Sequence, residues 1–485
     1  MAKTKRAADT SAFELPKCPS GIQGFDEITF GGLPKGRPTL VCGGAGCGKT
    51  LFAMEFLYRG AVEFNEPGVF MAFEEKEKDL TDNFASLGFE IRSLIKQKKL
   101  LVDYVYIERS EIEETGEYDL EGLFVRLAGA IESIGAKRVV LDTIEALFSG
   151  FSNETILRAE LRRLFRWLKD RKVTAIITGE KSGPLLTKHG LEEYVADCVI
   201  FLDHRVNEQI ATRRLKIIKY RGSRHGTNEV PFLIGETGFS VFPMTSLLLS
   251  CVASDERISS GIKSLDAMLD GKGYYRRSSI LVSGSAGSGK TSFGAQFINS
   301  VCQRGERALM FAFEESEGQL VRNMLSIGID LKKWVDKGLL KIVANRATLC
   351  GLEMHLVMAH TVVKKFNPLA VVIDPITTLI GAGIADEAKA MLARLLDFLK
   401  NEGVTVLATD LNISAEKDDV TEIGISSLCD TWIRLLMETQ GHQRIRRIAI
   451  IKSRGMKHGL VEKNLEITDK GLEIKDIPGV REDAR

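Results

Sequence analysis

The sequence has no long hydrophobic run and no excess of charge of one sign. Its apolar runs, such as Val139–Leu141 and Leu247–Leu249, fall far short of the about 20 residues that a membrane-spanning helix needs. Lys and Arg number 66 against 65 Asp and Glu, a net charge of +1, so no global positive field indicates a nucleic-acid partner. We therefore expect neither a membrane segment nor nucleic-acid binding.

The cysteine pattern excludes two further classes. The eight cysteines are scattered and form no C-x-x-C pair, which argues against a disulfide framework and against a zinc site. The first ten residues are polar and lack the apolar segment of a signal peptide. These features predict reduced thiols in a cytoplasmic protein.

What the sequence does contain is an internal repeat. At 485 residues the chain suits two domains of roughly 240 residues better than one core. Five motifs occur twice in the same order, the second copy 240, 241, 240, 232 and 233 positions after the first: Ser20–Asp26 and Ser260–Asp266, Gly43–Thr50 and Gly284–Thr291, Phe73–Glu75 and Phe313–Glu315, Leu141–Asp142 and Ile373–Asp374, Lys219–Gly222 and Lys452–Gly455. A period this long indicates domain duplication rather than a solenoid.

The duplication predicts the domain boundaries. We expect a flexible N-terminal segment (1–19), a first domain (20–246), a linker (247–258), a second domain (259–475) and a short tail (476–485).

Within each copy, apolar strand-like runs alternate with helical patterns, which predicts an α/β fold with a mainly parallel sheet flanked by helices. The predicted strands are Thr39–Gly43, Gly68–Phe73, Arg138–Asp142, Val173–Thr178 and an edge-like Arg214–Tyr220, then Ile280–Gly284, Ala308–Phe313, Ala370–Asp374, Val404–Asp410 and Arg446–Lys452. Leu51–Ala61 and Leu157–Lys169 are predicted helices.

The motif G-x-x-x-x-G-K-T follows an apolar strand and precedes a helix in both copies, which is the context of a phosphate-binding loop (P-loop). Its backbone N–H groups and the helix N-terminus attract phosphate, its lysine neutralises phosphate charge and its threonine ligates Mg²⁺. The cofactors expected are ATP, with ADP as product, and Mg²⁺. The predicted nucleotide-binding residues are Gly43, Gly44, Ala45, Gly46, Cys47, Gly48, Lys49, Thr50 and Leu51, and Gly284, Ser285, Ala286, Gly287, Ser288, Gly289, Lys290, Thr291 and Ser292.

Two sets of carboxylates follow buried strands. Asp142 and Asp374 each end an apolar run; a single Asp there is more often a helix cap, but the order after a phosphate loop favours a Mg²⁺ ligand together with the loop threonine. The catalytic candidates are pairs that begin 25 and 24 residues after the loop lysines, at Glu74, Glu75, Glu314 and Glu315. A carboxylate there orients water or accepts a proton from a hydroxyl; the alternative is a solvated helix start.

A basic segment follows the last long strand of each copy, with cations spaced so that two share one face of the strand. Its members are Lys219, Arg221 and His225 in the first copy and Lys452, Arg454 and His458 in the second. A cation that reaches a neighbouring subunit's γ-phosphate couples hydrolysis to assembly. A surface charge pattern and contact with nucleic-acid phosphates are the alternatives.

Over about Ser20 to Lys475 the chain resembles the KaiC family of RecA-like ATPases. The resemblance is carried by Gly24–Pro34, Glu66–Phe70, both Phe-Glu-Glu triplets, Gly190–Glu193 and the two K-x-R-G-x-x-H segments. It implies two tandem RecA-like P-loop NTPase domains in a double-ring homohexamer, with ATP at subunit interfaces. The first domain would be an ATPase and the second a serine/threonine autokinase and autophosphatase, acting as a clock or stress-signalling timer.

The resemblance also implies roles for single residues. Glu74 and Glu75 would be hydrolytic carboxylates, Glu314 the kinase base with Glu315 beside it, and the basic segments contacts to a neighbour's nucleotide. The phosphoacceptors align with Ser426 and Ser427, where cyanobacterial clock proteins carry Ser-Thr; the first copy has Glu192 and Glu193 in that region. Pro375 replaces the Thr143 of the first copy, so the two sites differ.

Cyanobacterial members continue into a longer tail that receives the activator KaiA. Because this chain stops at Arg485, we expect autophosphorylation without KaiA, whereas a KaiB-like partner of the first ring is plausible. The alternative function is a RecA-like DNA-dependent ATPase of the recombinase or helicase type, but we find no basic, glycine-rich DNA loop. A non-catalytic nucleotide-gated scaffold is disfavoured by the intact Lys, Thr, Asp and Glu of both copies.

Overall fold

The computed structural model describes residues 15–105, 120–148, 154–181, 186–187, 195–207, 210–235, 238–242, 254–347, 351–382, 385–411 and 425–478. The pair Glu192 and Glu193 lies outside these residues. The chain divides into two compact units, one built from residues 1–207 and 211–245 and the other from 246–485 with 208–210. Among the described residues, every helix is too short or too polar to cross a bilayer.

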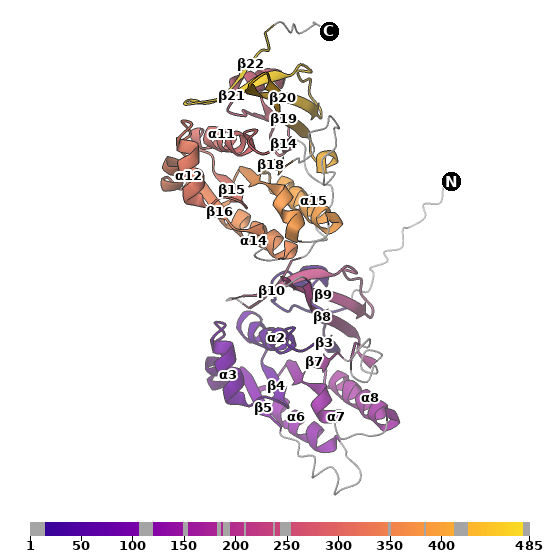
Figure 1. The fold of residues 1–485 in the computed structure, drawn as a ribbon. Helices are drawn as coiled ribbons and strands as arrows, with labels where there is room; N and C mark the ends of the chain where they lie inside the picture. The colour runs from indigo at the N-terminus through magenta and orange to yellow at the C-terminus, as the bar shows by residue number, and fades with distance from the viewer. Residues whose placement is uncertain are drawn as a thin grey trace, which may run out of the picture. The chain divides into compact units, whose positions relative to one another are not determined.

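The first unit is a nine-stranded sheet between helices (Figure 1). Its elements are β1 (Lys17–Cys18), α1 (Phe25–Ile28), β2 (Leu33–Pro34), β3 (Pro38–Gly43), α2 (Lys49–Glu63), β4 (Gly68–Ala72), α3 (Glu77–Ala85), α4 (Ile91–Lys96), β5 (Leu100–Tyr104), α6 (Glu121–Ile134), β6 (Arg138–Asp142), α7 (Ile144–Phe148), α8 (Glu154–Asp170), β7 (Thr174–Glu180), β8 (Cys198–Asn207), β9 (Ile210–Tyr220), β10 (Val230–Gly235) and β11 (Gly238–Val241). The strand order is β11-β10-β9-β8-β3-β7-β6-β4-β5. Strands β8, β3, β7, β6, β4 and β5 run parallel.

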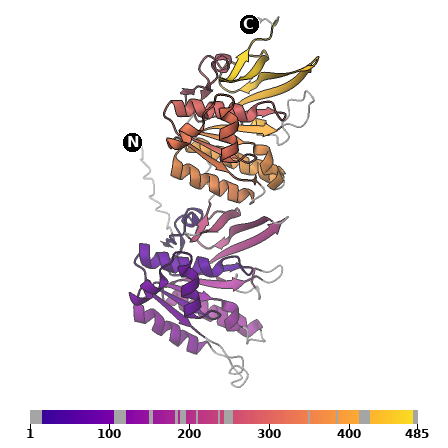
Figure 2. The same ribbon diagram turned by 60° about the vertical axis from the view of Figure 1, so that its left-hand side comes forward.

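The second unit repeats this architecture, as the turned view of Figure 2 also shows. Its elements are β12 (Arg257–Ile258), α10 (Lys263–Met268), β13 (Tyr274–Tyr275), β14 (Ser279–Gly284), α11 (Lys290–Gln303), β15 (Ala308–Ala312), α12 (Glu317–Leu325), α13 (Lys332–Asp336), β16 (Leu340–Ala344), α14 (Leu352–Phe366), β17 (Ala370–Asp374), η2 (Ile376–Ala382), α15 (Ala385–Asn401), β18 (Thr405–Leu411), η3 (Ile425–Ser427), β19 (Thr431–Gln440), β20 (Gln443–Ser453), β21 (Lys463–Thr468) and β22 (Gly471–Lys475). The strand order is β16-β15-β17-β18-β14-β19-β20-β21-β22. The predicted α/β fold, two tandem RecA-like domains with mainly parallel sheets, is confirmed.

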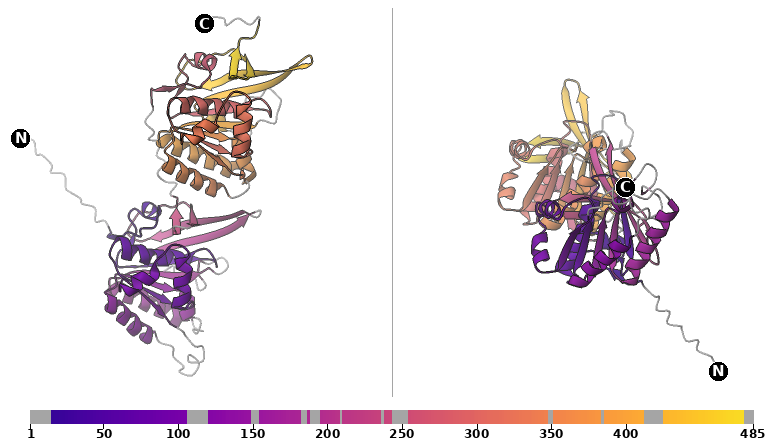
Figure 3. Two further views of the ribbon diagram at one scale, coloured as in Figure 1. Left: turned by 90° about the vertical axis from the view of Figure 1, so that its left-hand side faces the viewer. Right: turned by 90° about the horizontal axis from the view of Figure 1, so that it is seen from below.

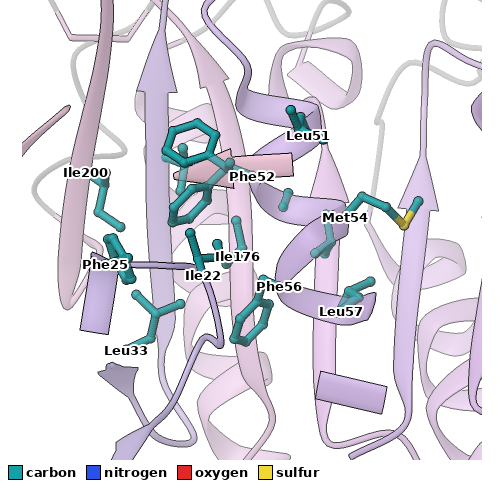
Figure 4. Packing of buried hydrophobic residues seen from close by; sticks show 14 of the residues in the cluster. Ile22, Phe25, Leu33, Leu51, Phe52, Met54, Phe56, Leu57, Ile176 and Ile200 are labelled. Atoms are coloured by element: carbon teal, nitrogen blue, oxygen red, sulfur yellow. The ribbon is translucent and has the colours of Figure 1, made fainter. Parts of the chain in front are cut away.

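Each sheet is buried on both faces by helices. In the first unit Phe52 of α2 packs edge-on against Phe25 at 5.1 Å and Phe239 at 5.2 Å between ring centroids, within the cluster of Figure 4. Helix α8 covers the other face with its buried leucines Leu157, Leu161, Leu164 and Leu168, which recur at the spacing of one helical stripe. Burial of these apolar surfaces fixes the strands whose ends form the sites.

The antiparallel strands complete each sheet on one side. The predicted strand at Arg214–Tyr220 is confirmed within β9, but its predicted edge position is wrong, because β9 lies between β8 and β10, with Leu215 paired to Val230. Its alternating pattern instead places Leu215 and Ile217 in the core and leaves Ile218 exposed. In the second unit the β19–β20 hairpin extends away from the other elements, as Figure 3 shows in yellow.

Candidate nucleotide sites

The phosphate loops connect β3 to α2 and β14 to α11, at the carboxyl edge of each sheet. Gly46 and Gly48 have φ values of +70° and +98°, a left-handed backbone that glycine adopts without strain. Lys49 Nζ donates to the Gly43 and Gly44 carbonyls at 3.0 Å each.

The second loop has the same geometry. Lys290 Nζ donates to the carbonyls of Gly284 at 2.7 Å and Ser285 at 2.8 Å. Both ammonium groups are therefore held inside their loops, where they would meet bound phosphates.

A buried carboxylate and a loop threonine lie together in each site. Asp142 accepts a hydrogen bond from Thr178, and the hydroxyl of the loop residue Thr50 interacts with the same carboxylate. Burial raises the pKa of the Asp142 carboxyl, and these hydrogen bonds act in the opposite direction. A buried carboxylate beside a threonine hydroxyl supplies the hard oxygen donors that Mg²⁺ prefers, and the remaining ligands of this ion are usually phosphates and water.

Asp374 repeats the arrangement in the second site: it accepts a hydrogen bond from Thr409, and the Thr291 hydroxyl interacts with its carboxylate. Burial likewise raises the pKa of its carboxyl. Among the described residues no group of three or more His, Cys, Asp or Glu side chains forms a metal cage. The residues present thus fit Mg²⁺ bound together with nucleotide phosphates.

The glutamate pairs follow β4 and β15, the strands beside those that end in the two aspartates. The peptide bond after each aspartate, Asp142–Thr143 and Asp374–Pro375, is cis. Thr143 Oγ1 donates to Glu74 Oε1 at 2.9 Å, which proline cannot do in the second site. The first glutamate of the pair therefore has a threonine hydroxyl as partner in the first unit, where the second unit has a proline.

A pocket of about 290 Å³ adjoins the first phosphate loop. Its polar groups beyond the loop are Glu75 and Asn83, and its apolar wall comes from α2, from α3 and from the residues just after α3. The lining residues are Gly46, Gly48, Lys49, Thr50, Leu51, Glu75, Leu80, Asn83, Phe84 and Leu87. In the second unit Asn323, at the position of Asn83, donates to Glu315 Oε2 at 3.2 Å. Apolar walls beside a phosphate loop suit the base of a nucleotide.

The family model described as "ATPase: KaiC" matches residues 18–246 and 258–478. This chain belongs to the KaiC ATPase family. It is 53% identical to "Circadian clock protein KaiC2" of Synechocystis sp. over 469 residues, which cover 96% of this chain and 82% of that protein. It is 38% identical to "Circadian clock oscillator protein KaiC" of Thermostichus vulcanus, with 96% and 90% covered, and 36% identical to the protein of that name in Prochlorococcus marinus, with 98% and 95% covered.

The late basic segments of this KaiC-family chain do not lie at the loop of their own unit. Thr431 pairs with Ser453 of β20 and with Ile280 of β14, whereas the phosphate loop begins at Gly284, four residues further along β14. At about 3.3 Å per residue, these four residues of β14 separate the end of the basic segment's strand from the start of the phosphate loop by about 13 Å. In the first unit Arg221 lies at the equivalent edge, 3.9 Å from Asp197, and the His225 ring stacks on Tyr220.

The second basic segment instead contacts the two serines predicted as phosphoacceptors. Lys452 Nζ donates to the Ser426 carbonyl at 2.5 Å, and Arg454 Nη2 donates to the Ser427 carbonyl at 2.9 Å. His458 Nδ1 lies 3.2 Å from the Gly459 carbonyl. Ser426 is half-buried and Ser427 exposed, so these cations and serines form one cluster at the amino edge of the sheet.

Several site residues escaped the sequence analysis. Thr178 and Thr409 hydrogen-bond the two aspartates predicted to bind Mg²⁺, and Arg446 Nε donates to the Gly287 carbonyl of the second phosphate loop at 3.1 Å. A usable signal existed for the threonines, because both stand third from last in corresponding strands of the repeat. Nothing comparable marks Arg446, one of several arginines on β20.

Proposed function

We propose that the first domain hydrolyses ATP and that the second transfers the γ-phosphate of ATP to Ser426 and Ser427. The observation that carries the proposal is the asymmetry of the two units: the second has two adjacent serines whose backbone carbonyls accept hydrogen bonds from Lys452 and Arg454. The first instead has a threonine hydroxyl on its candidate base, Glu74.

In the first site, Lys49 and the loop amides would bind the phosphates, and Glu74, oriented by Thr143, would position water and accept its proton. The water oxygen attacks the γ-phosphorus as the bond to the β-phosphate oxygen breaks, which leaves ADP and phosphate. Thr50 and Asp142 would hold Mg²⁺, which supplies positive charge to the phosphates when bound.

In the second site the attacking oxygen would be a serine hydroxyl and Glu314 would accept its proton, so that the products are phosphoserine and ADP. Thr291 and Asp374 would hold Mg²⁺ there. Because the serines of one chain lie at the sheet edge opposite its own phosphate loop, the phosphate donor would be the nucleotide of a neighbouring copy. Such transfer supports the ring-shaped homohexamer that the sequence resemblance implies.

A timing role follows from the relatives' names, and we propose that the chain acts as a clock or timer component whose phosphorylation state stores information. A KaiB-like protein is the proposed partner of the first domain. Lys219, Arg221 and His225 would contact a neighbour's nucleotide in the first ring, as Lys452, Arg454 and His458 would in the second.

The experiment is mass spectrometry of the full chain after incubation with Mg·ATP. Wild type is expected to carry phosphate on Ser426 and Ser427, Glu314→Gln to lose most of it, and Ser426→Ala/Ser427→Ala to carry none. Phosphate at other residues, or in the double variant, would refute the kinase assignment. Release of inorganic phosphate by the double variant tests the ATPase assignment separately.

A further inference from the structure

One strand end in each unit lies where the terminal phosphate would bind. In the sheet order β7 stands between β3, which leads into the phosphate loop, and β6, which ends at Asp142. Likewise β18 stands between β14 and β17, which ends at Asp374. Residues at the carboxyl ends of β7 and β18 therefore lie between the phosphate loop and the metal-site aspartate.

At this strand end the two units carry different residues that compensate for each other. The first unit has Gly179 at the penultimate position of β7 and a glutamate, Glu145, on α7. The second has an aspartate, Asp410, at the penultimate position of β18 and a threonine, Thr377, on η2. The carboxylate is thus on the helix in the first unit and on the strand in the second.

Hydrogen bonds show that these positions are equivalent. In the first unit Glu145 Oε1 accepts the backbone N–H of Glu180, the last residue of β7, at 2.6 Å. In the second unit Thr377 Oγ1 accepts the backbone N–H of Leu411, the last residue of β18, at 3.2 Å. Glutamate and threonine therefore perform the same local task, and only the first of them also brings a charge.

The carboxylate occupies the same place in both units. A Cβ atom added to Gly179 would lie 3.3 Å from Glu145 Oε1, so the glutamate fills the space into which a side chain at that position extends. In the second unit that side chain is Asp410 itself, which is 1% exposed. Each site thus keeps one carboxylate at this point, supplied by a different element.

Asp410 lies beside the start of the phosphate loop. It pairs with Ser283 of β14, the residue directly before Gly284, where the loop begins. On its other side β18 pairs with β17, which ends at Asp374. Charges interact strongly inside a protein because little water screens them.

We propose that this carboxylate, the buried Asp410 in the second site and the half-buried Glu145 in the first, is a specificity-determining group that weakens binding of ATP relative to ADP. It would repel the terminal phosphate, which ADP lacks, more than the phosphates nearer the base. The inference rests on the proposed nucleotide sites and deepens their role. In the second site, tighter retention of ADP would move the bound equilibrium toward phosphoserine and ADP.

The experiment compares Kd values for Mg·ADP and for the magnesium complex of the non-hydrolysable β,γ-imido analogue of ATP. The parent is the full chain with Lys49→Ala, which disables the first loop, and with Ser426→Ala/Ser427→Ala, which removes the acceptors. Asp410→Asn keeps the shape of the side chain and removes its charge. We expect the affinity for the ATP analogue, relative to ADP, to rise about tenfold.

The matched control places the carboxylate in the second unit where the first unit has it, on the helix instead of the strand. Asp410→Gly should raise the relative affinity for the ATP analogue as Asp410→Asn does, and Thr377→Glu/Asp410→Gly should return it to the parental value. A purely structural role would change both affinities by the same factor and would overturn the inference, as would an unchanged ratio in Asp410→Asn. These binding ratios do not depend on serine phosphorylation, so failure of the kinase assignment would leave them interpretable.

Discussion

At the scale of single residues, the two sites differ most clearly in what orients the first glutamate of each pair. Thr143 donates to Glu74, and Pro375 stands at the corresponding position of the second unit. A general base acts efficiently only when its carboxylate is held in reach of the nucleophile. If Glu74 is the base of the first site, as proposed above, the threonine hydroxyl is its positioning group.

Thr143→Val is expected to lower ATP hydrolysis by the first domain about tenfold, because it removes the hydrogen bond that fixes Glu74 but keeps the shape of the side chain. The measurement is phosphate release in a Lys290→Ala background, which disables the second loop. Thr361→Val is the matched control, since it removes a helix hydroxyl of α14 that bonds only locally, to Val357. Equal rates for Thr143→Val and this control would contradict the prediction.

Much of the residue-scale chemistry could be predicted from sequence because the phosphate loop is a local motif. The contacts of Lys49 with Gly43 and Gly44 span five or six positions. By contrast, Thr178 meets Asp142 across 36 positions and Arg446 meets Gly287 across 159. Such pairings arise from sheet order, which the spacing of residues does not encode.

At the scale of elements, helices α14 and α15 pack together on one face of the second sheet. The His360 ring of α14 stacks on Phe398 of α15, with 3.4 Å between ring centroids and 16° between planes. Burial lowers the pKa of His360 from its ordinary 6.5 to about 4, and the nearby Lys364 acts in the same direction. The helix pair thus contains a histidine that stays neutral as the protein is acidified.

This histidine predicts an acid-sensitive helix pair. Between pH 6.5 and about 4 the unfolded chain binds a proton at His360 that the folded chain does not, so stability is complete above this window and falls as pH falls through it. When the pH is lowered from 7 to 5, the unfolding temperature of the second unit should fall by about 3 °C less in His360→Gln than in wild type. His442→Gln, an exposed histidine at the β19–β20 turn, should behave like wild type. An identical acid response in His360→Gln and wild type would contradict this.

Fully buried strands were predicted well from the sequence. Strand ends and strand positions that depend on pairing with neighbouring strands were predicted less well. The run Arg138–Asp142 matches β6 because a fully buried parallel strand is continuously apolar. The prediction Val173–Thr178 missed the polar end of β7, which continues to Glu180 through pairing with β3. The position of β9 inside the sheet depends on β10, which lies later in the chain.

At the scale of the whole molecule, each parallel sheet separates two kinds of chemistry. Phosphate loops, aspartates and glutamates lie at the carboxyl edge, because strand ends bring residues from distant parts of the chain together there. Ser426, Ser427, Lys452 and Arg454 gather at the opposite edge of the second sheet. A chain built this way would need another copy to phosphorylate it.

A mixing experiment tests this dependence on a second copy. Lys290→Ala chains keep both serines but lack the ammonium of the second phosphate loop, whereas Ser426→Ala/Ser427→Ala chains keep the loop and lack the acceptors. Neither variant alone should become phosphorylated at these serines, whereas subunits of the two kinds assembled together with Mg·ATP should place phosphate on the Lys290→Ala chains, identified by mass spectrometry with one variant isotope-labelled.

The mixing experiment distinguishes transfer between two copies from transfer within one chain. Transfer within one chain would have to cross about 13 Å of strand, far beyond the about 3 Å at which a hydroxyl attacks phosphorus. Phosphate should therefore increase on Lys290→Ala chains as the fraction of acceptor-free subunits rises. If mixed assemblies leave these chains unmodified while wild type is phosphorylated under the same conditions, transfer occurs within a chain and the need for a second copy is refuted.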